Sequence, residues 1–183
     1  YSSDYTVVVD CDDLLIAADY ANTLTIDADI ISGSTGTGAI HTYSYSINKI
    51  IINTGSTVQN TTGASGITLS SYDHGTIENK GSIISNSGHA IILQGTGSNA
   101  GTLVNLINSG SITAPGAVSG ALVISTSKGI SNFTNTGIMN GGGVDISTSV
   151  LASTYLTNFR NSQGGSDAVT YQGKLPVNYF III

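Results

Sequence analysis

Acidic side chains cluster near the start of the sequence and form the first candidate site. Asp10, Asp12 and Asp13 offer hard carboxylate oxygens, which are the ligands that Ca²⁺ takes in proteins. Their spacing is not that of an EF-hand loop, and the glycine of that loop is missing. Two interpretations stay open. One is a calcium site, the only cofactor that the sequence suggests, and the other is a solvated acidic cap that prevents mispairing of a terminal strand.

Histidines beside a carboxylate form the second candidate site. His74 directly follows Asp73, and His89 comes later in the sequence. An adjacent carboxylate and imidazole can act as an oriented general base, and two histidines can be ligands of a metal ion. No local motif marks a serine or cysteine nucleophile, and Cys11 is distant in the sequence. Exposed loop histidines are therefore the interpretation that we favour.

Paired carboxylates would point to a glycosidase, because such enzymes hold two of them about 5 to 9.5 Å apart. Asp73 and Glu78 can approach one another if a turn separates them, and Asp145 can lie on the same face. A polysaccharide lyase needs a basic proton acceptor, and the single arginine, Arg160, lies in an irregular stretch. We therefore expect no catalytic site, with a carbohydrate-active enzyme as the alternative.

The composition narrows the class of protein. Only 9% of the 183 residues are charged, against roughly 25% in an ordinary soluble domain, while 40% are hydrophobic. A net charge of −6 with five Lys and Arg excludes a basic surface for nucleic acid. No apolar run is long enough to cross a bilayer as a helix. The start at Tyr1, without a leader, is expected of a mature exported chain or an excised fragment.

A short motif, apolar-x-Asn-x-Gly, recurs along the sequence. Clear copies begin at Ile51, Ile77, Leu106 and Phe133, and a degenerate copy begins at Phe159. An earlier copy has aspartate in place of asparagine. The key positions are Asp27, Asn53, Asn79, Asn108, Asn135 and Asn161, with spacings of 26, 26, 29, 27 and 26 residues. Such near-equal spacing indicates a true structural repeat.

Each repeat holds short β-type runs, such as residues 67–69, 90–93 and 121–124, and no helical periodicity. This period predicts an all-β fold, a right-handed parallel β-helix of about six rungs of roughly 27 residues. We expect the asparagines to stack at one corner and to bond amide to amide. Asparagine also tolerates left-handed backbone angles, and the adjacent glycines leave room where a Cβ would clash.

The two ends of the sequence depart from the repeat. Residues 1–22 are expected to form an N-terminal cap or an atypical first rung, residues 23–172 the solenoid, and residues 173–183 a C-terminal strand or tail. The tail ends in an apolar run without polar cover, and such a strand can add to a neighbouring subunit. The residues expected to self-associate are Tyr179, Phe180, Ile181, Ile182 and Ile183.

Residues 79–83 and 108–112 share the form Asn-x-Gly-Ser-Ile. This rung pattern resembles the passenger regions of bacterial autotransporters and related β-solenoid surface adhesins, over roughly residues 20–172. The resemblance implies secretion to the bacterial cell surface and a role in adhesion or self-association. It carries no active-site motif.

We therefore expect a non-enzymatic structural or adhesive protein that associates head to tail with further copies of itself. A contact between unlike ends does not close, so its repetition gives a filament or an array. A host or surface glycan is the other expected partner. Tyr43 and Tyr45 share a face of any strand that they form and would suit a carbohydrate-binding module, which is a further alternative.

Overall fold

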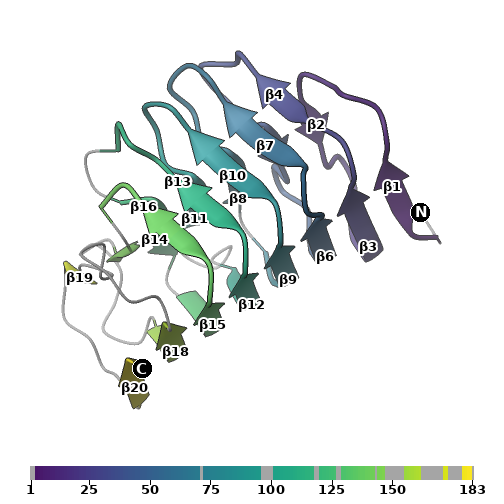
Figure 1. Ribbon diagram of the computed structural model, residues 1–183. Coiled ribbons are helices and arrows are strands. Elements are labelled where there is room, and N and C mark those ends of the chain that lie inside the picture. Colours follow the sequence, from purple (N-terminus) through teal and green to yellow (C-terminus); the bar gives the residue numbers. More distant parts are fainter. Residues whose placement is uncertain are drawn as a thin grey trace.

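A computed structural model describes residues 3–70, 72–95, 101–117, 120–126, 129–142, 144–146, 155–161, 171–172 and 179–182. These residues contain strands and no helix. Every pairing between the strands is parallel. Figure 1 shows the strands stacked side by side from the N-terminal end to the C-terminal end.

The strands form three sheets, here called A, B and C. Sheet A has eight strands, in the order β1 (Tyr5–Val7), β3 (Tyr20–Ile26), β6 (Ile47–Ile52), β9 (His74–Asn79), β12 (Thr102–Asn108), β15 (Gly129–Asn135), β18 (Tyr155–Asn161) and β20 (Tyr179–Ile182). Sheet B has five, from β4 (Ile30–Ser32) through β7 (Thr57–Asn60), β10 (Ser82–Ser85) and β13 (Ser111–Thr113) to β16 (Ile138–Asn140). Sheet C has seven, in the order β2 (Leu14–Leu15), β5 (Ile40–His41), β8 (Ile67–Ser70), β11 (Ile91–Gly95), β14 (Leu122–Thr126), β17 (Val144–Ile146) and β19 (Tyr171–Gln172).

The chain visits the sheets in turn. β6, β7 and β8, for example, belong to sheets A, B and C, and β9, β10 and β11 repeat the same path one turn later. Each strand is bonded to the strands of the turns before and after it, which is the arrangement of a parallel β-solenoid. The predicted all-β parallel solenoid is therefore confirmed. Its right-handed sense and its number of rungs stay predictions.

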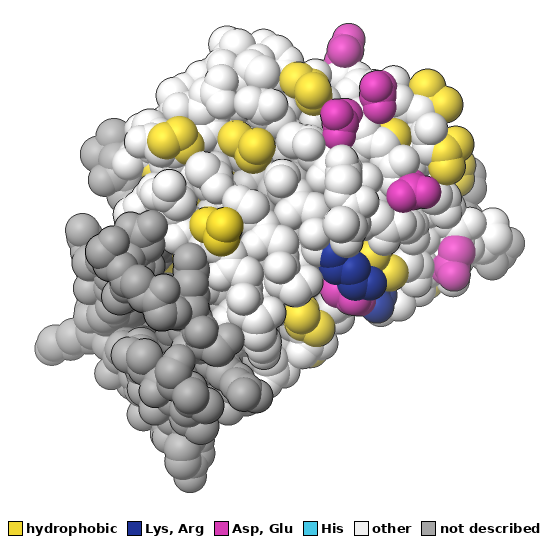
Figure 2. All heavy atoms as spheres, viewed as in Figure 1, with side chains coloured by type: hydrophobic (Ala, Val, Ile, Leu, Met, Phe, Trp, Pro, Cys, Tyr) yellow, Lys and Arg dark blue, Asp and Glu magenta, His cyan; other side chains and the backbone are white. Residues whose placement is uncertain are grey.

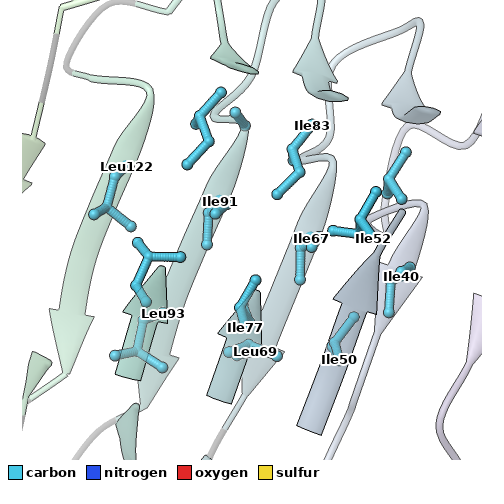
Figure 3. Close-up of a cluster of buried hydrophobic side chains, with 14 of the residues drawn as sticks. Ile40, Ile50, Ile52, Ile67, Leu69, Ile77, Ile83, Ile91, Leu93 and Leu122 are labelled. Carbon is cyan, nitrogen blue, oxygen red and sulfur yellow. The ribbon is translucent and has the colours of Figure 1, made fainter. Parts of the chain in front are cut away.

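Apolar side chains fill the interior of the solenoid in stacked rows. Ile40, Ile67 and Ile91 are in register on successive strands of sheet C, and all three are fully buried. Ile50 and Ile77 form a similar pair on sheet A. Figure 3 shows these side chains in one buried cluster. Burial of an aliphatic side chain of this size stabilises a fold by about 1.5–3 kcal/mol, so these rows supply the main driving force.

Both ends of the chain join the solenoid. β1 pairs with β3 and β2 pairs with β5, while Cys11 forms an isolated bridge with Ile30 next to sheet B. The first residues therefore pair with the following turn, while the predicted division into cap or atypical first rung, solenoid and tail stays a prediction. At the other end, β20 pairs with β18 as the last strand of sheet A. Between residues 162 and 183, only β19 and β20 are described.

Candidate functional site

A row of asparagines runs through the interior of sheet A. Asn79, Asn108 and Asn135 are in register on β9, β12 and β15, and all three are fully buried. Nδ2 of Asn79 donates to Oδ1 of Asn108 at 2.7 Å, and Nδ2 of Asn108 donates to Oδ1 of Asn135 at 2.6 Å. The same two Nδ2 atoms also donate to backbone carbonyl oxygens at 3.0 and 3.1 Å. The predicted amide ladder is confirmed for these residues, and Asn161 holds the next register position.

Asp27 and Asn53 do not belong to this row, so the prediction that all the key positions stack in one row is wrong for these two residues. The residue in register with Asn79 on β6 is Ile52, and Ile26 precedes it on β3. Asp27 and Asn53 lie one residue later, where Nδ2 of Asn53 donates to Oδ1 of Asp27 at 3.2 Å. Residues 53–56 separate β6 from β7, whereas only residues 80–81 separate β9 from β10. The longer corner moves Asn53 out of the row.

Glycines of the motif pack against the backbone of the preceding turn. A Cβ on Gly110 would overlap the carbonyl oxygen of Gly81, and a Cβ on Gly137 would overlap that of Gly110. The prediction that glycine leaves room at this corner is therefore confirmed. The tolerance of asparagine for left-handed backbone angles is not used at the described asparagines, none of which has a positive φ. Among the described residues, Tyr43 and Tyr72 are the non-glycine residues with positive φ.

The predicted calcium ligands are not brought together around an ion. No group of three or more His, Cys, Asp or Glu side chains in the described part of the chain is arranged to hold a metal. Oδ1 of Asp10 accepts the backbone N–H of Asp29 at 2.9 Å, while Asp12 and Asp13 are exposed. The structure therefore gives Asp10 a bonding role between two turns of the backbone.

Several carboxylates make the same kind of bond, which sequence reasoning missed. Oδ1 of Asp19 accepts both the backbone N–H and the hydroxyl of Ser46, each at 2.9 Å. These two bonds lower the pKa of the Asp19 carboxyl below its ordinary value. Equivalent bonds join the carboxylates of Asp4, Asp29 and Asp73 to the backbone N–H groups of Thr23, Thr57 and Thr102, respectively. Aspartate thus acts here as a connector between turns.

His74 is buried, so the expectation of an exposed loop histidine is wrong for it. Its side chain is 1% exposed at the start of β9, and both ring nitrogens lack a hydrogen-bond partner. Burial lowers the pKa of His74 to about 4, and the nearby negative charge of Asp73 acts in the opposite direction but does not offset it. His89 is partly exposed, and its Nδ1 lies 2.9 Å from the carbonyl oxygen of Gly120. The two histidines therefore do not form a common metal site.

The carboxylates considered for catalysis are held apart. Asp73 directly precedes β9 and Glu78 is the last residue but one of that strand, so extended strand and no turn lies between them. Five residues of strand span roughly 16 Å, which exceeds the separation of a glycosidase pair. Asp145 lies on sheet C, whereas Glu78 lies on sheet A. The expectation that a turn brings Asp73 to Glu78 is therefore wrong.

Glu78 is instead the centre of an ion-pair cluster. Its carboxylate oxygens lie 2.8 Å from Nζ of Lys49 and 2.9 Å from Nζ of Lys80. These two lysines lower the pKa of the Glu78 carboxyl. Figure 2 shows this small basic spot beside a carboxylate, with further acidic side chains nearer the N-terminal end. A nearly neutral surface covers most of the remaining described face.

The N-terminal end of the solenoid is an apolar surface. Tyr5, Leu14, Ile16 and Leu24 help to line a hollow of about 380 Å³ there. Tyr5 is 59% exposed although its neighbours in the same row, Leu24 and Ile50, are buried. Further large apolar side chains are exposed on this end, namely Val8, Val9 and Leu15. Part of the apolar surface of the first turn is thus uncovered, although Val7 in the row of Ile26 is buried.

Comparisons with protein-family models, curated proteins and solved structures found no match. Function has to be inferred from the geometry of the molecule. No helix among the described residues is long and apolar enough to span a membrane.

The register of sheet A connects its two outermost strands. One row begins at Val7 on β1, passes through Ile52 and Asn108, and reaches Ile182 on β20. The adjacent row begins at Thr6 and reaches Ile181. Because all strands run in one direction, the outer edges of β1 and β20 are complementary in hydrogen bonding. This pair of edges is the candidate functional site.

Proposed function

We propose that this protein is a non-enzymatic structural solenoid that assembles end to end into a filament. In this assembly, β20 of one copy pairs in parallel with β1 of the next. The observation that supports it is that β1 and β20 are the outermost strands of one sheet with a single strand direction. A translation along the stack therefore brings the two edges together, and a contact between unlike ends continues without closing.

The rows of sheet A define the register of this contact. Continuing the sheet by one copy places Ile182 beside Val7 and Ile181 beside Thr6. Pairing would satisfy the backbone N–H and C=O groups that an edge strand leaves unbonded within the chain. The contact would also bring two apolar residues, Val7 and Ile182, together in the row whose middle members are asparagines.

The apolar N-terminal end gives the contact a hydrophobic contribution. Tyr5, Val8 and Val9 are 59%, 66% and 72% exposed, and Tyr5 lines the hollow together with Leu15, which is 56% exposed. A second copy on this end would remove that surface from water, at roughly 25 cal/mol for each Å² of apolar area. The low content of charged residues, 9%, limits like-charge repulsion along the stack as a whole, while the exposed carboxylates of Asp10, Asp12 and Asp13 lie in the first turn.

The remaining features of the proposal come from the sequence. We take the coil to be right-handed, with about six rungs, and the protein to be secreted to the bacterial cell surface, as its resemblance to autotransporter passengers implies. Adhesion would then use the sides of the filament. The nearly uncharged surface of the described face is compatible with such a role.

Lysines placed on the N-terminal edge test the proposal. We expect Val8→Lys combined with Val9→Lys to prevent assembly, because both side chains are exposed directly after the edge strand β1 and charge beside an edge strand opposes pairing. Deletion of residues 179–183 should have the same effect. Filaments would be followed by negative-stain electron microscopy and by sedimentation velocity.

The matched control carries the same charges in the middle of sheet A. Val104→Lys combined with Ile107→Lys changes side chains that are 42% and 41% exposed on β12. This control should assemble like the unmodified chain. A wild-type chain that stays monomeric at high concentration, or edge variants that still form filaments, would contradict the proposal.

A further inference from the structure

Three exposed tyrosines lie where the chain passes from sheet C to sheet A. Tyr43 and Tyr45 follow β5, and Tyr72 follows β8. Their side chains are 59%, 38% and 46% exposed, respectively. We call these three residues the tyrosine corner. It lies outside strands β1 and β20, whose edges form the proposed assembly contact.

The register places two of these tyrosines at the same position in successive turns. Strands β5 and β8 pair with an offset of 27 residues, as in Ile40 with Ile67. Strands β6 and β9, on the other side of the corner, pair with the same offset. The two corners therefore have equal length, and Tyr72 occupies the position of Tyr45 one turn later in the register. The two corners differ in backbone path, because positive φ falls at Tyr43 in the first and at Tyr72 in the second.

The backbone at this corner is strained at two of the exposed tyrosines. Tyr43 has φ of 52° and Tyr72 has φ of 114°, and they are the non-glycine residues with positive φ among those described. A φ of 114° is a region that glycine occupies far more readily than tyrosine. A Cβ on Gly101 would overlap the carbonyl oxygen of Tyr72, so the next turn is fitted to this backbone. Strain of this kind concentrates at functional sites.

Polar side chains adjoin the aromatic ones. The rings of His41 and Tyr43 have centroids 4.8 Å apart and are tilted by 32°, which fixes the direction of the Tyr43 ring. Nε2 of His41 lies 3.4 Å from Oγ of Ser70, which in turn accepts from Nε2 of Gln94 at 3.0 Å. The corner thus combines aromatic rings with three hydrogen-bonding side chains, those of His41, Ser70 and Gln94.

We propose that the tyrosine corner binds a neutral polysaccharide. Pyranose rings have apolar C–H faces that pack on tyrosine rings and hydroxyls that bond to tyrosine hydroxyls and neighbouring polar side chains. A chain of linked sugars can contact tyrosines from both of these turns. Acidic glycans fit less well, because the chain has a net charge of −6 and both described lysines, Lys49 and Lys80, are paired with Glu78.

Affinity electrophoresis tests the proposal with defined probes. The native protein would be run in gels that contain laminarin, soluble xylan or hydroxyethylcellulose, and in gels that contain the acidic polymers alginate or hyaluronan. We expect retardation by at least one of the neutral polymers and none by the acidic ones. Tyr72→Ala and Tyr43→Ala should each weaken retardation at least fivefold, and Tyr72→Phe should keep most of it.

A glycine variant separates binding from folding. Tyr72→Gly removes the ring and also relieves the positive φ, so it should keep or raise the melting temperature while it abolishes retardation. Val104→Ala, an exposed position on sheet A, is the matched control and should bind normally. The proposal is overturned if no neutral polymer retards the protein or if the tyrosine variants bind like the control. It is also overturned if these variants change only the sedimentation coefficient, since the corner would then contact a second copy.

Discussion

Nδ2 of Asn79 donates to Oδ1 of Asn108 at 2.7 Å, while Oδ1 of Asn79 is itself buried without a partner. The cause lies one turn earlier, where the residue in register is Ile52, which has no hydrogen-bond donor in its side chain. The interior row of sheet A therefore changes from apolar side chains to amides at this step. An unpartnered buried acceptor costs about 1–3 kcal/mol, so the ladder must offset a penalty at its first member.

An asparagine in the amide ladder should contribute more to the free energy of unfolding than an asparagine that has the same sequence motif but lies outside the ladder. Asn108→Ala removes bonds to both neighbours and leaves buried amide groups unpartnered, so the free energy of unfolding should fall by about 2–4 kcal/mol. Asn53→Ala, at a position with the same sequence motif, loses one 3.2 Å bond to an exposed carboxylate and should cost under about 1 kcal/mol. Urea unfolding measures both. Equal losses would mean that the row has no special role.

His74 should make the fold sensitive to acid. Its pKa is lowered to about 4 in the folded state from an ordinary 6.5, so the unfolded state takes up the proton first as the pH falls. Stability should therefore fall between pH 6.5 and pH 4, by about 3 kcal/mol in all, and His74 should add no pH dependence above that window.

The variant His74→Leu isolates this effect, because carboxylates titrate in both proteins and cancel in the difference. The difference in unfolding free energy between the two proteins should vary between pH 4 and pH 6.5 and should be constant above pH 7. Two parallel curves across the whole range would show that the imidazole is not buried as described.

The ion-pair cluster should contribute little, and salt should remove its effect. Glu78→Gln breaks the contacts to Lys49 and Lys80, which are partly exposed, so the expected loss is about 0.5–1 kcal/mol at low salt. The lowered pKa of Glu78 means that this stabilisation is present at neutral pH and is lost as the carboxyl is protonated in acid. Thermal unfolding at low and at 1 M salt tests this, and a loss unaffected by salt would argue against an electrostatic origin.

Glycines that contact a neighbouring turn should not accept a methyl group. Gly110→Ala would place a Cβ against the carbonyl oxygen of Gly81, which belongs to the backbone and has little room to move. We expect a loss of at least about 2 kcal/mol or failure to fold. Gly36→Ala is the control, because nothing lies within 4 Å of its added Cβ, and its stability should stay within about 0.5 kcal/mol.

Much of the fold is predictable from the sequence because the repeat is carried by core residues. The runs at 67–69, 90–93 and 121–124 coincide with β8, β11 and β14, and the stacking of Asn79, Asn108 and Asn135 follows from their spacing. The prediction that Asn53 stacks with Asn79 was wrong because the apolar-x-Asn-x-Gly pattern contains no information about the length of the corner that follows. The buried row of Ile26 and Ile52 sets the register there.

The site was less predictable than the fold. His74 looks like a loop residue because Asp73 precedes it and Gly75 follows it, yet sheet pairing carries it into the interior. The tyrosine corner could be found only in part, since positive φ values at Tyr43 and Tyr72 have no sequence signal. The complementary edges of β1 and β20 required the topology of sheet A, which local patterns do not encode.

Disulfide trapping tests end-to-end assembly most directly. In a Cys11→Ser background, Thr6→Cys and Ile181→Cys place thiols at the two ends of one register row. Adjacent Cα atoms of paired strands are close enough for a disulfide. Thr6→Cys with Ile107→Cys, in the middle of the same row, is the control. Oxidation should convert the first protein into a ladder of reducible multimers and leave the control largely monomeric. A first protein that stays monomeric, or cross-links no more than its control, would contradict the proposed assembly.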